Sequence, residues 1–98
     1  MSDFRRLKQS LLDNRFAYRL RVERVVDDGA FADLIGNLRT LAVLWQNEAL
    51  VDKELAGWLL HTVQQVAGNT DWLARTDPDR AGDIVGTTYE AAFACFED

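Results

Sequence analysis

The chain contains almost no cysteine, histidine or proline, with one residue of each among its 98. Because the lone Cys95 cannot form a disulfide within the chain, a small secreted scaffold held by disulfides is excluded, and a reducing compartment is expected. One cysteine and one histidine, His61, are too few for a zinc site, which needs about four such ligands. We therefore expect no metal, and we interpret Cys95 as a small packing residue.

Long apolar segments are also missing. Uninterrupted apolar runs such as Leu41–Trp45 are far shorter than the roughly 20 residues that cross a bilayer. Met1 is followed by Ser2, Asp3 and a basic stretch, where a signal peptide would have its apolar core. The sequence therefore predicts a cytoplasmic protein with no membrane segment.

Motifs for catalysis and cofactor binding are absent as well. Ser2 and Ser10 are the only serines and lie in no nucleophile elbow, and neither a Walker A loop nor a GxGxxG sequence occurs. The acidic residues Asp77, Asp79 and Asp83 lack the full pattern and the closing Glu of a calcium loop. We predict that the protein is not an enzyme and has no catalytic residue, cofactor or small-molecule substrate.

The chain does contain apolar residues at helical spacing, separated by short polar breaks. The breaks fall at Asp27–Gly29, 47–52, Gly68–Thr70 and Thr76–Pro78. This pattern predicts an all-α fold, a compact bundle of four main helices plus one short helical turn at Thr70–Ala74, in a single helical domain over residues 1–98. Asp28, Asp52 and Asp77 are the expected N-caps of the later helices, with Pro following Asp77.

The first segment, residues 3–27, allows two structures. The helical spacing of its apolar residues favours one continuous helix, which we prefer because no partner strand is evident. Phe16, Tyr18, Leu20 and Val22 also alternate with residues 17, 19, 21 and 23, as in a strand, and the pair Asp13 and Asn14 would then separate a short helix from that strand. An α+β fold with a short strand near 16–26 is therefore the alternative.

Charge is divided unevenly along the chain. Residues 1–24 hold seven basic and three acidic residues, whereas residues 25–98 hold four basic and thirteen acidic residues, within a net charge of −5. A basic segment joined to an acidic body indicates a partner, self-association or internal pairing. The acidic body disfavours nucleic acid, because it would repel a phosphate backbone.

On a continuous helix, three basic residues form a flank beside a second apolar row, displaced from the main stripe. These candidate partner-binding residues are Lys8, Arg15 and Arg19 on the flank, and Leu12, Phe16 and Leu20 in the row. A helix with two apolar rows needs two surfaces to pack on, and the second can be another copy or a partner protein. The alternative is internal, with both rows in the core and the basic residues paired to Asp33, Glu48, Asp52 or Glu54.

These features predict a small non-catalytic cytosolic protein-interaction module. Such a module would act as a regulator, adaptor or inhibitor of a partner protein, or associate with itself as a homodimer. The alternative function is a small nucleic-acid-associated regulator that uses the basic N-terminal helix.

Overall fold

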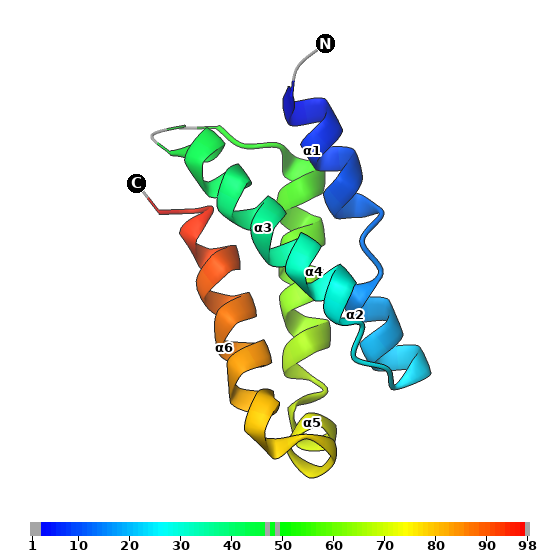
Figure 1. Cartoon of the computed structure of the whole chain (residues 1–98). Coiled ribbons are helices and arrows are strands. Elements are labelled where there is room, and N and C mark those ends of the chain that lie inside the picture. The colour runs from blue at the N-terminus through cyan, green and yellow to red at the C-terminus, as the bar shows by residue number, and fades with distance from the viewer. Residues whose placement is uncertain (1–2, 47, 49, 98) are drawn as a thin grey trace.

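The computed structural model describes residues 3–46, 48 and 50–97, and it is helical throughout with short connections (Figure 1). The elements are α1 (Asp3–Leu12), α2 (Phe16–Tyr18), the π-helical turn η1 (Arg19–Glu23), α3 (Asp28–Trp45), α4 (Lys53–Ala67), α5 (Thr70–Thr76) and α6 (Pro78–Ala94). The predicted all-α bundle is confirmed, and no strand occurs in these described ranges.

The helices form an elongated bundle of 41 × 24 × 19 Å. α3 packs on both α1 and α6, while α4 contacts α6 on one side and α2 with η1 on the other (Figure 1). The short α5 closes the end of the bundle where α4 leads into α6. The N-terminal segment therefore lies along one edge of the bundle, and α6 lies along the opposite edge.

Capping residues set where the later helices begin. The Oδ1 atom of Asp52 accepts a hydrogen bond from Leu55 N at 2.9 Å, which confirms Asp52 as the N-cap of α4. The N-cap of α3 is Asp27, whose Oδ1 accepts from Ala30 N at 3.0 Å, so the prediction of Asp28 is wrong by one residue. Asp77 holds the N-cap position of α6 without a side-chain cap, and Pro follows at the first helical position, where its missing N–H costs nothing.

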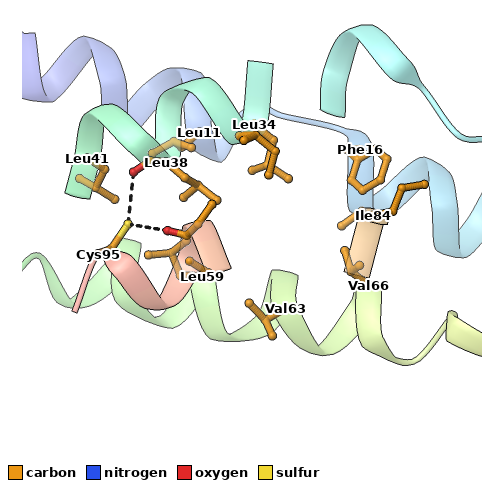
Figure 2. Packing of buried hydrophobic residues seen from close by; sticks show 14 of the residues in the cluster. Leu11, Phe16, Leu34, Leu38, Leu41, Leu59, Val63, Val66, Ile84 and Cys95 are labelled. Carbon is orange, nitrogen blue, oxygen red and sulfur yellow. Dashed lines mark hydrogen bonds between the residues drawn. The ribbon is translucent and has the colours of Figure 1, made fainter. Parts of the chain in front are cut away.

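Leucine side chains from α1, α3 and α4 fill one core, which Phe16, Ile84 and Cys95 complete (Figure 2). The Cys95 thiol donates weak hydrogen bonds to the carbonyl oxygens of Leu38 at 3.4 Å and Ala91 at 3.5 Å. Burial raises the pKa of this thiol to about 11, because the interior disfavours the thiolate. Cys95 is thus a packing residue, as the sequence indicated.

The N-terminal segment differs from both structures considered for it. α1 ends at Leu12, and helix resumes at Phe16, so the continuous helix over 3–27 is wrong, and so is the strand near 16–26. The cause is Asn14, whose Oδ1 accepts from Phe16 N at 2.9 Å while its Nδ2 donates to Ala30 O at 2.9 Å. Such side-chain bonds compete with the helical backbone ladder and hold the break open.

Candidate partner-binding groove

Two of the six residues proposed for partner binding lie in the core. Phe16 and Leu20 are 0% exposed, and the Phe16 ring packs 4.9 Å from the ring of Phe31, measured between centroids. Neither side chain can touch a partner in this conformation, so their proposed role as surface anchors is corrected. The physical reason is that the break before α2 lets this row turn inward, where burying a phenyl ring is worth more than exposing it.

Two more of the six are paired within the chain. Lys8 Nζ lies 2.9 Å from both Asp52 Oδ2 and Glu54 Oε1 at the start of α4. Hydrogen bonds to Glu54 and Asp52 raise the pKa of Lys8. The pKa of Asp52 is lowered by the backbone N–H of Leu55 and then by Lys8. Lys8 is therefore paired within the chain, which is one of the two alternatives that the sequence left open.

Arg19 is paired in the same way at the other end of the segment. Its Nε lies 2.7 Å from Glu23 Oε1, and its Nη1 lies 2.6 Å from Asp27 Oδ2. Hydrogen bonds to Glu23 and Asp27 raise the pKa of the Arg19 guanidinium. The backbone N–H of Ala30, followed by Arg19, lowers the pKa of Asp27. Arg19 therefore ties η1 to the N-cap of α3.

The last two of the six, Leu12 and Arg15, line a groove between the N-terminal segment and α4. Two hollows of about 440 and 510 Å³ share His61 and Gln65 and so adjoin one another. We call this continuous surface the α2–α4 groove. One wall carries Leu12, Arg15, Tyr18, Arg21 and Arg24, and the other carries Trp58, His61, Gln64 and Gln65.

The α2–α4 groove is cationic. No carboxylate lines either hollow, and Arg15, Arg21 and Arg24 form no ion pair with any carboxylate in the part of the chain that the structure describes. The reason lies in α4, because residues 55–70 contain no acidic residue that could neutralise the opposite wall. The groove therefore presents three uncompensated positive charges to solvent.

Aromatic and amide groups hold two of these arginines in place. The Arg15 guanidinium lies 4.3 Å from the centre of the Tyr18 ring, and Tyr18 is itself 40% exposed. Arg24 Nη1 donates to Asn69 Oδ1 at 2.8 Å, and its guanidinium lies 5.6 Å from the Trp72 ring. These contacts fix the side chains without removing their charge, so part of the ordering cost of binding is already met.

The backbone conformation of η1 orients the groove wall that carries Arg21 and Arg24. The Val25 N–H reaches the Arg19 carbonyl at 3.2 Å across the turn, and Arg24 adopts the left-handed conformation, with φ 57° and ψ 42°. Non-glycine residues rarely adopt this conformation, and π-helical turns are often found at functional sites. The turn buries Leu20 while leaving Arg21 on the groove wall.

Sequence reasoning missed Arg21, Arg24 and His61 as groove residues. The straight helix expected for residues 3–27 does not bring these positions together on one surface. The acid-free stretch 55–70 was the available signal, since only a wall without carboxylates leaves an arginine cluster opposite it unpaired.

A larger hollow of about 820 Å³ lies on the other side of Arg15, between the 13–15 break and α3. Its lining mixes charges of both signs, including Asp13, Asp27 and Asp33 with Arg15 and Arg19. Arg19 is already paired there, so this hollow presents no comparable excess of one charge.

Over the described ranges, no group of three His, Cys, Asp or Glu residues is placed to hold a metal ion. Within the same ranges, no helix combines the length and apolarity needed to span a bilayer. Comparison with family models, curated proteins and solved structures finds no match for this chain. The functional argument therefore rests on the geometry of the groove.

Proposed function

We propose that this protein is a small non-catalytic cytosolic interaction module that binds an acidic segment of a partner protein in the α2–α4 groove. Through that contact it acts as a regulator, adaptor or inhibitor of the partner. The observation that carries the proposal is the cluster Arg15, Arg21 and Arg24, which lines a groove without any carboxylate.

Arginine suits this role because its planar guanidinium can donate two parallel hydrogen bonds to one carboxylate. Tyr18 and the half-buried Trp58 add aromatic surface between the charged groups. Aromatic and arginine side chains are the residues that most often dominate binding energy at protein interfaces. The expected ligand is therefore a peptide segment with carboxylates on both sides of an apolar anchor.

The test is fluorescence anisotropy with a labelled peptide in which a Leu-Phe pair is flanked by glutamates. The wild-type chain is expected to bind this peptide more than about 10-fold tighter than a peptide with glutamine in place of glutamate, with affinity falling as salt rises. Arg15→Glu/Arg21→Glu should weaken binding by at least about 10-fold. The matched control Arg6→Glu/Arg39→Glu makes the same charge change at exposed positions outside the groove and should bind almost as tightly as wild type.

Equal loss in the groove and control variants would overturn the proposal, because it would show attraction by overall charge alone. Tighter binding of a single-stranded oligonucleotide than of the acidic peptide, with the same dependence on Arg15 and Arg21, would favour the nucleic-acid alternative instead. Circular dichroism on both variants checks that the helices are retained.

A further inference from the structure

The C-terminal end of α6 carries an aromatic surface that the described chain leaves uncovered. Phe93 and Phe96 keep 48% and 45% of their surface exposed, and Val43 at the adjoining end of α3 keeps 71%. The Phe93 ring lies 5.5 Å from that of Tyr89, and the Phe96 ring lies 5.8 Å from that of Trp45. Both phenylalanines are therefore held against the bundle while part of each ring faces solvent.

Carboxylates border this aromatic surface. Glu90 and Glu97 are exposed, and neither forms an ion pair with a basic residue in the described ranges. Glu90 and Phe93 follow i, i+3 spacing on α6, and Glu97, just beyond the helix, lines a hollow with Val43 and Ala94. We call the surface formed by Val43, Glu90, Phe93, Phe96 and Glu97 the α6 face.

The α6 face has the chemistry that the α2–α4 groove requires of a ligand. It has two carboxylates around an aromatic anchor and no basic side chain, whereas the groove has three arginines and no carboxylate. The N-terminal segment, which forms one wall of the groove, and α6 lie along opposite edges of the bundle (Figure 1), so the groove cannot receive the α6 face of its own chain. Pairing of two α6 faces or of two grooves would oppose like charges.

We propose that copies of this chain associate head to tail, with the α6 face of one copy bound in the α2–α4 groove of the next. This proposal rests on the proposed function of the groove as a binding site for an acidic ligand. Each added copy retains one free groove and one free α6 face, so the contact is heterologous and the assembly stays open. The contact joins charged groups at the protein surface, so the association is weak and is favoured by high concentration and low salt.

Sedimentation velocity on the full chain tests this assembly. At low salt, the weight-average mass is expected to rise above the 11.1 kDa of one chain and to keep rising between about 10 µM and about 1 mM. Arg15→Glu/Arg21→Glu and Glu90→Lys/Glu97→Lys should each remain monomeric. The control Asp79→Lys/Asp83→Lys makes the same charge change elsewhere on α6 and should associate like wild type.

A chain that combines Arg15→Glu/Arg21→Glu with Glu90→Lys/Glu97→Lys, and so has an acidic groove and a basic α6 face, should associate again. An unfolded variant could not produce this recovery. Phe93→Ala tests the anchor without a charge change and should lower the extent of association. A mass that stops at two copies would overturn the proposal, as would association that survives Glu90→Lys/Glu97→Lys. A wild-type chain that binds the acidic peptide yet stays monomeric at about 1 mM would overturn the self-association alone and leave the proposed function standing.

Discussion

α1 and the α2–η1 turn are two pieces of one basic segment, yet they use their charges differently. In α1, Lys8 meets Asp52 and Glu54 and becomes part of the scaffold. In the α2–η1 region, Arg15 and Arg21 face a part of α4 that contains no acidic residue, and they remain available to a ligand. The difference lies in what stands across the interface, since the residue types on the basic side are nearly the same.

Arg19 sharpens this lesson, because it belongs to the same turn as Arg21 and is nevertheless paired. Its side chain points toward Glu23 and Asp27, on the α3 side of η1, whereas Arg21 lies on the α4 side. The facing element therefore decides whether a basic residue stabilises the fold or presents a charge. Four experiments test this division between scaffold and surface, beginning with the largest expected effect.

Replacing Phe16 by Asp should unfold the protein. The change removes a fully buried phenyl ring and places a carboxylate in the core, at a combined cost above about 4 kcal/mol, which is close to the whole stability of many small domains. The measurement is far-ultraviolet circular dichroism with thermal melting. Tyr18→Ala, two residues away and partly exposed, should keep the helices and weaken peptide binding. Helical structure in Phe16→Asp equal to wild type would show that this row is surface and break the comparison.

Replacing Asn14 by Ala should destabilise the protein by about 1–2 kcal/mol. The substitution removes the two hydrogen bonds, to Phe16 N and Ala30 O, that hold the break between α1 and α2. Urea unfolding measures the change in the free energy of unfolding. Asn14→Asp keeps the acceptor for Phe16 N and should lose less stability than Asn14→Ala, and equal losses would contradict the role assigned to that bond.

Acid should destabilise the fold by protonating the carboxylates of the scaffold pairs. The pKa values of Asp27 and Asp52 are lowered in the folded protein. Their contribution to the free energy of unfolding is therefore complete above the ordinary carboxyl pKa of 3.8 and is lost as the pH falls below that value. Thermal melts between pH 7 and pH 2 should show falling stability below about pH 4. In Asp27→Asn the acid-dependent loss should be smaller, and an unchanged profile would remove Asp27 as a source.

Replacing Lys8 by Ala should have the smallest effect, even though Lys8 makes two ion pairs. Ion pairs that remain in contact with water contribute little to the free energy of unfolding. The melting temperature should therefore stay within about 3 °C of wild type. Peptide binding should be unchanged, because Lys8 does not line the groove. A loss of peptide affinity in Lys8→Ala, as large as in Arg15→Glu/Arg21→Glu, would contradict the division between scaffold and surface charges.

Much of the fold was predictable, and only part of the groove was. Helical spacing and the cap at Asp52 identified α3, α4 and α6, since these signals are local. The break after Leu12 was visible as the pair Asp13 and Asn14, but the helical turn that follows was not. The alternation of apolar and polar residues in 16–22 is strand-like, and the structure accommodates it in α2 and η1, where contacts with α3 and α4 override local preference.

The amino-acid sequence by itself determined the helical class, the basic character of the first segment and the absence of acid from residues 55–70. These follow from residue type and short-range spacing, which need no knowledge of distant neighbours. Only the tertiary structure decided that Lys8 meets Asp52, 44 positions away, while Arg15 and Arg21 meet no carboxylate among the described residues. The physical reason is that electrostatic attraction depends on separation in space, and the turn at η1 with the packing of α4 sets that separation.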